Sequence, residues 1–90
     1  MYSLSCTGAF LKDVKRLKNR SINFQILKKT IESLEKDGKV NASFKPHKLG
    51  GHYSDCWECH LKPDWLLIWI KDPTLKEIQL IRTGTHADLF

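Results

Sequence analysis

His60, Asp64, Arg82 and His86 lie within the last 31 residues, in two blocks that could carry out acid–base chemistry. The first block, H-L-K-P-D-W, begins at His60, and the second, R-T-G-T-H-A-D-L-F, begins at Arg82. Imidazole groups transfer protons near neutral pH, and a guanidinium group stabilises the negative charge of a phosphorane-like transition state. The two blocks therefore predict a site that acts on a phosphate ester.

A short meander of strands is predicted to hold these blocks. Strand-forming residues occupy 53–61, 65–71 and 75–83, and the turns at 62–64 and 72–74 each contain a proline, which lacks the N–H that a central strand needs. The apolar run 65–70 indicates a central strand buried on both faces. The first and third strands end at the same edge of the sheet. We expect His60, Asp64, Arg82 and His86 at that edge, with His47 and His52 of the preceding loop within reach.

The first half of the chain predicts a strand and two helices. Residues 2–6 alternate and are rich in strand formers, and a helix begins at Thr7 or Gly8. A second helix runs from about Asn23, a candidate cap, to residue 36, and Gly38 ends it. Residues 40–51 are expected to form a loop. The fold class is α+β in the order β-α-α-β-β-β: one domain, 1–90, with two helices packed on a small, mostly antiparallel sheet and a short C-terminal turn or helix.

Positive charge is concentrated in the first half of the chain. Residues 1–50 hold 11 Lys and Arg against 4 Asp and Glu, whereas residues 51–90 hold 4 against 6, although the whole chain carries +5. Clustered basic side chains attract a phosphate backbone, so Lys15 and Arg16 on the outer face of the first helix are candidate RNA-binding residues. An acidic protein partner, or a solvated helix surface, would explain the same pattern.

Composition indicates a cytoplasmic protein that does not act in a membrane. No apolar run approaches the roughly 20 residues of a membrane-spanning helix, and the N-terminal residues lack the features of a secretion signal. Three cysteines are an odd number, so we expect reduced thiols rather than a disulfide framework, and we expect all three to be buried and inert.

Cys56-Trp57-Glu58-Cys59-His60 matches the C-x-x-C-H pattern of covalent haem attachment, and it could alternatively suggest a zinc site. Haem attachment of this kind belongs to exported proteins, and no export signal is found. On a strand, two cysteines three positions apart point to opposite faces, so they do not easily bind one ion. We therefore expect neither a metal nor another cofactor.

The two catalytic blocks resemble the YafQ branch of the RelE/ParE-like bacterial toxins, which belong to type II toxin-antitoxin pairs. The specific matches are H-x-x-P-D-W from His60 and R-T-G-T-H-x-x-L-F from Arg82; F-x-K-D-V-K-R from Phe10 and the L-G-G run at residues 49–51 extend the resemblance over nearly the whole chain. It implies a metal-independent mRNA endoribonuclease, or interferase, that acts on translating ribosomes and is silenced by a cognate antitoxin, here expected to be acidic.

The resemblance also implies roles for individual residues. It assigns acid–base catalysis to His47, His60, Asp64 and His86, with Trp65, Arg82 and Phe90 in support. The family usually has D-H-P-L where this chain has Pro46-His47-Lys48-Leu49, so His52 is an alternative to His47. Trp65 and Phe90 could each stack on an RNA base or belong to the core.

RNA carries its own nucleophile, the ribose 2′-hydroxyl. The protein must therefore supply a base, an acid for the departing 5′-oxygen, and positive charge. We assign the base to His60 or Asp64, the acid to His86 and the phosphate contact to Arg82. The alternative function is that of a non-catalytic ParE-like toxin, or of a small RNA- or protein-binding module, but neither needs the histidine–aspartate cluster. RNA sequence preference, ribosome dependence and which histidine is the base and which the acid are not specified by the sequence.

Overall fold

The structure, a computed structural model, describes the backbone of residues 1–90 and the side chains of all residues but His52. The prediction that His52 is an alternative to His47 as a catalytic residue therefore concerns a side chain that lies outside the described ones. Along the chain the elements are β1 Ser3–Cys6, α1 Gly8–Lys18, α2 Gln25–Asp37, the 3-10 helix η1 Ala42–Phe44, β2 His47–Lys48, the 3-10 helix η2 Gly51–Tyr53, β3 Trp57–Lys62, β4 Trp65–Asp72, β5 Glu77–Gly84 and α3 His86–Leu89.

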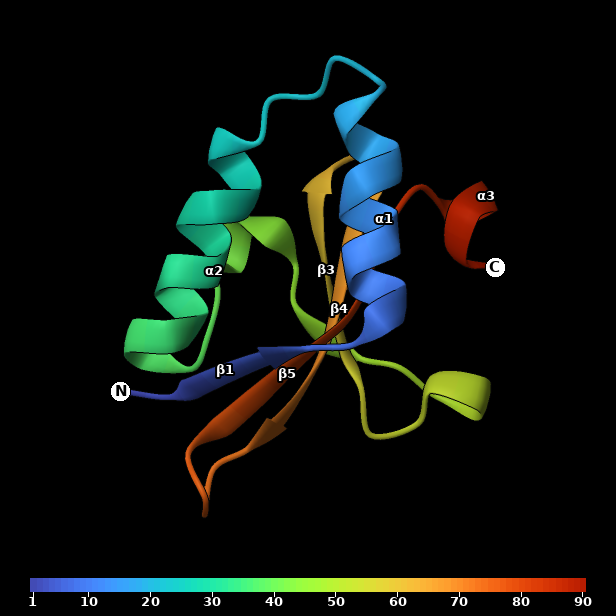
Figure 1. Cartoon of the computed structure of the whole chain (residues 1–90). Helices are drawn as coiled ribbons and strands as arrows, with labels where there is room; N and C mark the ends of the chain where they lie inside the picture. The colour runs from blue at the N-terminus through green and yellow to red at the C-terminus, as the bar shows by residue number, and fades with distance from the viewer.

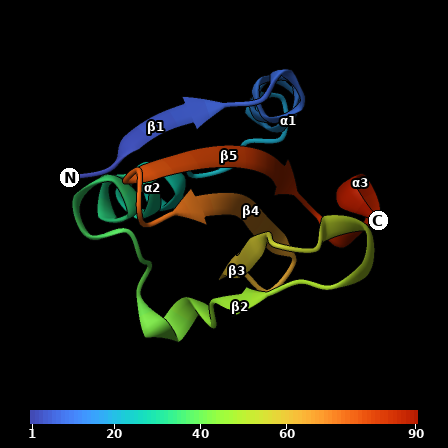
Figure 2. The ribbon, with the colours of Figure 1, turned by 90° about the horizontal axis from the view of Figure 1, so that it is seen from below.

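A five-stranded sheet in the order β1-β5-β4-β3-β2 forms the centre of the molecule (Figures 1 and 2). β1 pairs with β5 in parallel, and the other neighbours are antiparallel. The predicted α+β order is confirmed, with the first strand added to the meander and a short helix at the C-terminus. The structure adds β2, which falls in the stretch predicted to be a loop, and it begins β3 at Trp57 rather than at residue 53 because η2 and a turn come first.

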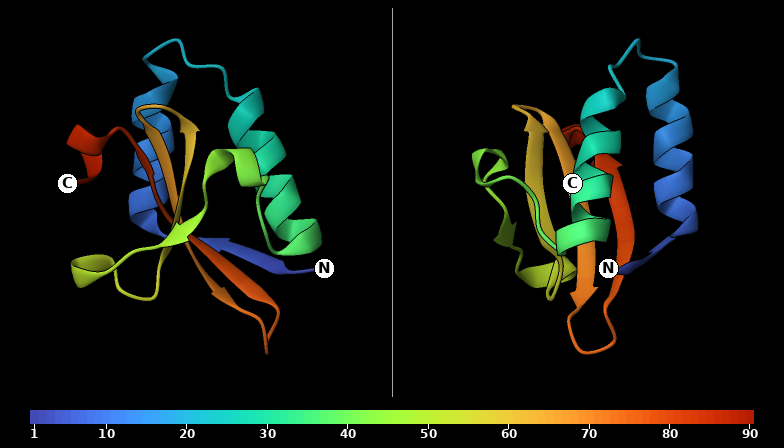
Figure 3. Two further views of the ribbon diagram at one scale, coloured as in Figure 1. Left: turned by 180° about the vertical axis from the view of Figure 1, so that it is seen from behind. Right: turned by 90° about the vertical axis from the view of Figure 1, so that its left-hand side faces the viewer.

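Helices α1 and α2 cover one face of the sheet (Figure 3). Their apolar stripes pack on alternate residues of the strands, and the buried members of this main core are Phe10, Leu17, Leu27, Leu34, Val40, Cys59, Leu61, Trp65, Leu67, Trp69, Ile78 and Leu80. A smaller cluster of Cys56, Leu66, Ile68 and Leu89 lies on the other face. Because residues 65–69 of β4 are buried towards one cluster or the other, the predicted central strand is confirmed; only Ile70 at the end of its apolar run reaches solvent.

Local signals in the sequence set the helix ends. Thr7 caps α1, its side chain accepting the Phe10 N–H at 2.9 Å, as its position before the helix predicts. Gly38 ends α2 in the left-handed conformation with φ 71°, and the Tyr2 ring lies where a side chain would be. The prediction that Asn23 caps α2 is wrong: Phe24 is the N-cap, and Asn23 accepts the Gln25 N–H from one position earlier. No helix among the described residues has the length and apolar character needed to cross a membrane.

The three cysteines are free thiols in different surroundings. Cys56 and Cys59 pack in the two separate clusters, in agreement with the argument that they face apart. Burial raises the pKa of the Cys59 thiol to about 12, which keeps it protonated and unreactive. The expectation that all three are buried is wrong for Cys6, which is exposed because β1 is an edge strand with solvent beside it.

Trp65 joins β4 to the main core. Its side chain is 5% exposed, its ring meets Phe24 edge-on, and its Nε1–H donates to Thr83 Oγ1 at 3.0 Å. The Thr83 hydroxyl donates in turn to the Leu66 carbonyl at 2.8 Å, so the buried indole N–H and the hydroxyl both have partners. Little of the ring is available to stack on a base.

Replacing Trp65 with alanine should lower the free energy of unfolding by about 3–5 kcal/mol, the usual cost of removing a buried aromatic side chain. Trp65→Phe should cost less, because most of the apolar volume stays while the bond to Thr83 is lost. Urea denaturation followed by circular dichroism would measure both changes. A loss below about 1 kcal/mol for the alanine variant would contradict the core position of Trp65.

Candidate active site

One row across the sheet carries three of the polar residues. The register pairs His47 of β2 with Glu58 of β3, Glu58 with Ile68 of β4, and Ile68 with Arg82 of β5. Ile68 belongs to the cluster on the face opposite α1 and α2, and directly paired residues point to the same face of a sheet. The row therefore lies on the open face, and His60, two residues after Glu58, joins it there.

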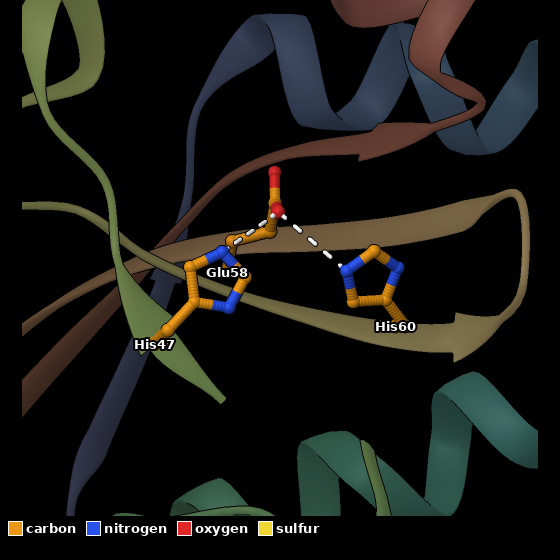
Figure 4. Close-up of side chains that lie close together, drawn as sticks. All are labelled: His47, Glu58 and His60. Atoms are coloured by element: carbon orange, nitrogen blue, oxygen red, sulfur yellow. Dashed lines mark ion pairs between the residues drawn. The ribbon is translucent and has the colours of Figure 1, made fainter. Parts of the chain in front are cut away.

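Glu58 lies between two histidines (Figure 4). Its Oε1 atom is 3.2 Å from His47 Nε2 and 3.9 Å from His60 Nε2, and only 7% of its side chain is exposed. The His47 Nδ1 atom lies 3.0 Å from the Lys45 carbonyl, so both ring nitrogens of His47 face oxygen acceptors. The P-H-K-L sequence thus holds His47 in a defined orientation towards Glu58, although the family's usual residues around it differ.

The same three side chains could bind a metal ion. One ligand atom from each of His47, Glu58 and His60 lies within 4.8 Å of the other two. Imidazole and carboxylate ligands suit zinc and copper. This set does not include the cysteines that the C-x-x-C-H motif singled out.

His86 is held by Asp64 at the adjoining end of the sheet. The Asp64 Oδ1 atom accepts the His86 backbone N–H at 3.0 Å and lies 2.8 Å from His86 Nδ1. These two contacts, of which the backbone contact has the larger effect, hold the pKa of the Asp64 carboxyl below its usual value. At neutral pH the carboxyl is therefore ionised and can accept hydrogen bonds but not donate them. Nδ1 must then carry the proton in this pair, and Nε2 is the nitrogen available for proton transfer.

Helix α3 carries His86 and is fixed at its start by Asp88. Thr85 and Asp88 form a capping box, in which Thr85 Oγ1 accepts the Asp88 N–H and the Asp88 carboxylate accepts the Thr85 N–H. Arg20 donates two hydrogen bonds to this carboxylate, at 2.8 and 3.1 Å, and they are the main reason why the Asp88 pKa is strongly lowered. Arg16 adds a contact at 3.5 Å. The end of α1 and the segment after it therefore anchor the helix that presents His86.

Replacing Arg20 with alanine should slow the RNA cleavage that the family resemblance implies by about 3- to 10-fold, because an active-site group displaced by about 1 Å can cost as much as 100-fold in rate and the capping box would still restrain α3. Amide hydrogen exchange in residues 85–90 should become faster. Lys18→Ala removes an exposed charge at the last residue of α1, two positions before Arg20, and is the control. Equal rates for both variants would show that the Arg20–Asp88 pair does not position His86.

Arg82 is bound to a carboxylate from α1. Its Nε and Nη2 atoms donate to the two oxygens of Asp13 at 2.6 and 3.0 Å, and Asp13 also accepts the Thr83 N–H at 3.1 Å. The hydrogen bonds to Asp13 raise the Arg82 pKa, and Asp13 itself is buried. Arg82 thus lies in the same row of the sheet as Glu58 and His47, but part of its guanidinium group is engaged in attaching α1 to the sheet.

Aromatic rings form a continuous series along the open face. Ring centroids are 6.0 Å apart for His47 and His60, 6.0 Å for His60 and His86, and 6.4 Å for His86 and Phe90. Phe90 is 64% exposed and meets the Tyr53 ring edge-on at 5.5 Å. Of the two aromatic residues predicted in support, Phe90 therefore has a surface on which a base can stack.

The two basic residues predicted on α1 are placed differently. Lys15 is exposed on the outer face of the helix. Arg16 is directed to carboxylates, with ion pairs to Asp13 and Asp88. Lys15 is the better placed of the two for contact with an RNA backbone.

Comparison with known proteins identifies the family. The sequence model described as "Bacterial toxin of type II toxin-antitoxin system, YafQ" matches residues 2–90. The chain belongs to the YafQ family of toxins. The mRNA interferase toxin YafQ of Escherichia coli strain K12 is 35% identical to this YafQ-family chain over 85 residues, which are 93% of this chain and 90% of the relative.

Solved structures of similar toxins share the whole fold. The E. coli DinJ-YafQ complex matches with a TM-score of 0.89 and 32% identity, covering 100% of this chain and 99% of the other. A metal-bound toxin from Helicobacter pylori matches with a TM-score of 0.89 and 32% identity over 100% of both chains.

The sequence-based interpretation missed Glu58 and Asp13. Glu58 lies inside the C-x-x-C-H motif, which specifies the two cysteines and the histidine but not the residue at this position. Its signal was the i, i+2 spacing to His60, since alternate residues of a strand share a face. Asp13 is part of the F-x-K-D-V-K-R match in this YafQ-family chain, but a carboxylate among basic residues gives no sign that it is buried against Arg82.

Proposed function

We propose that this protein cleaves mRNA by acid–base catalysis on the open face of its sheet and acts as the toxin of a type II pair. The observation that carries the proposal is a pair of histidines, each next to a carboxylate, with ring centroids 6.0 Å apart: His60 beside Glu58, and His86 beside Asp64. One phosphate group lying over the edges of these two neighbouring rings can come within hydrogen-bond distance, about 3 Å, of a nitrogen atom of each.

His60 is the proton acceptor in this proposal. It is part-exposed, whereas Glu58 is buried, so the imidazole can reach the substrate while the carboxylate stabilises its charged form. The 3.9 Å separation of Glu58 Oε1 and His60 Nε2 exceeds a hydrogen bond, but such contacts often shorten when substrate binds. His60 takes the proton of the ribose 2′-hydroxyl, and the 2′-oxygen then attacks the adjacent phosphorus.

His86 is the proton donor. As the bond from phosphorus to the 5′-oxygen breaks, protonated His86 transfers a proton from Nε2 to that oxygen, while Asp64 holds Nδ1 and stabilises the imidazolium. This role makes Asp64 a positioning residue rather than the base. The products are a 2′,3′-cyclic phosphate and a 5′-hydroxyl. His47 and Arg82 supply positive charge next to the phosphate.

Family membership supports a cytoplasmic toxin that is silenced by a protein partner. A related E. coli toxin is found in the DinJ-YafQ complex. For this chain we propose a cognate acidic antitoxin that covers the basic surface of α1 and the histidine series, and an mRNA substrate presented by the ribosome. Charge pairing between such a partner and the basic half of the chain would favour rapid and specific association.

A single ribose tests the mechanism. An mRNA with 2′-deoxyribose at the cleaved position should resist cleavage there, while the all-ribose control is cut, because the nucleophile has been removed. EDTA should leave the rate unchanged, and added copper should inhibit, since it would occupy His47, Glu58 and His60. Unimpaired cleavage of the deoxyribose substrate, or activity abolished by EDTA, would rule the mechanism out.

A further inference from the structure

Next to the His60 ring, β3 has an unpaired edge. β2 pairs only His47 and Lys48 with β3, at Glu58 and Trp57, so within the part of the chain that the structure describes the later residues of β3 have no strand on that side. The segment that contains η1 comes close to β3 there. Between them lies a cavity of about 540 Å³, which we call the Phe44 pocket; its lining includes Phe44, Lys45, His60, Lys62 and Pro63.

The lining of the Phe44 pocket combines rings with positive charge. Phe44 is half-buried and provides an aromatic wall. The His60 ring belongs both to the pocket and to the series of rings that runs from His47 to Phe90. Lys45 and Lys62 are exposed, and no acidic residue lines the cavity among the described side chains. A flat, anionic ligand matches this chemistry, because bases stack on aromatic side chains and lysines attract phosphates.

The pocket is also joined to the catalytic residues through the backbone. Lys45 adopts a left-handed conformation with φ 53°, and its carbonyl lies 3.0 Å from His47 Nδ1. A ligand in the pocket would therefore touch both the His60 ring and the residue that supports His47. In an RNA strand bound at the histidines, a nucleotide directly attached to the scissile phosphate, on its 5′ or its 3′ side, can reach the Phe44 pocket.

We propose that the Phe44 pocket binds the nucleotide adjacent to the scissile phosphate, with its base against Phe44 and its own phosphate near Lys45 or Lys62. This assignment rests on the proposed function, which locates the scissile phosphate between His60 and His86. The pocket then sets which ribose is presented to His60, so it determines where the strand is cut.

Two variants and a fluorescent RNA test the proposal. The probe is a short RNA with one ribose in an otherwise 2′-deoxy strand, and 2-aminopurine replaces the base on either the 5′ or the 3′ side of that ribose. Binding should quench the fluorescence from one of these two positions. Phe44→Leu keeps an apolar side chain in the core but removes the ring, and Lys62→Gln removes one charge. Lys36→Gln, at an exposed position on α2, is the control.

Phe44→Leu should reduce the quenching and raise KM by about 5- to 100-fold, the equivalent of the stacking of one base, with kcat changed little. Lys62→Gln should raise KM less, and Lys36→Gln should behave as the wild type. Quenching and KM that both variants leave unchanged would overturn the proposal. Weakened antitoxin binding with unchanged RNA binding would assign the pocket to the antitoxin instead, which also overturns it.

A variant without the acid separates this proposal from the proposed function. His86→Ala should bind and quench the same probe without cutting it. If it binds in this way but the wild-type protein cuts neither this probe nor a ribosome-bound mRNA, the catalytic assignment fails and the Phe44 pocket stands. If the wild type cuts the probe without quenching at either position, the pocket assignment fails and the catalytic assignment stands.

Discussion

Replacing His86 with alanine should lower kcat for RNA cleavage by about 10²- to 10⁴-fold, the usual contribution of a general acid or base. The KM should change little, because the imidazole acts on the leaving oxygen only as the bond breaks. The fold should be unaffected, since His86 is exposed and α3 is anchored through Thr85 and Asp88. Single-turnover cleavage of a defined RNA, together with a thermal melt, would measure both properties.

The Asp64→Asn variant, compared with His86→Ala, tests whether Asp64 acts through His86. Asparagine can still accept the His86 backbone N–H, but it carries no charge to stabilise the imidazolium that donates the proton. We expect a smaller loss of kcat than for His86→Ala, and the double variant should be no worse than His86→Ala alone, because Asp64 acts through His86. Two losses that multiply in the double variant would show that Asp64 has a catalytic role of its own.

The sheet was largely predictable because its strands carry strong local signals. An apolar run between two proline-containing turns places β4 at the centre of the sheet, and the alternation of apolar and polar residues along β5 marks that segment as a strand. β2 was not predictable, since two residues are too few to show a period. It is nevertheless the strand that brings His47 to Glu58 at 3.2 Å. The site therefore depends on a piece of structure that only the tertiary fold reveals.

Which basic side chains are free and which are paired with carboxylates was the least predictable feature of the site. Counting basic residues indicated a surface free to bind phosphates, yet three arginines are engaged by carboxylates: Arg16 and Arg82 by Asp13, and Arg20 by Asp88. Arg16 and Asp13 form an i, i+3 pair on α1. The other two pairs join residues 69 and 68 positions apart, so no local pattern in the sequence signals them. Lysines, including Lys15, Lys45 and Lys62, are exposed.

Glu58→Gln should lower kcat by about 10²-fold or more, although glutamine has nearly the same shape. The carboxylate is buried between His47 and His60, and in such surroundings a charge interacts with its neighbours more strongly than it does in water. Without that charge, the imidazolium formed when His60 accepts the 2′-hydroxyl proton loses its stabilising partner. RNA binding should be kept, so the loss should fall on kcat rather than on KM.

Glu77→Gln is the control for this change, because it makes the same substitution at an exposed strand position on β5. Copper titration gives a readout that does not depend on cleavage: Glu58→Gln should weaken copper binding by removing one of three clustered ligands, whereas Glu77→Gln should not. A Glu58→Gln protein that folds normally and cleaves RNA within about threefold of the wild-type rate would remove Glu58 from the mechanism, since the loss of a catalytic acid–base partner costs far more than that. His60 would then have to accept the proton without a carboxylate beside it.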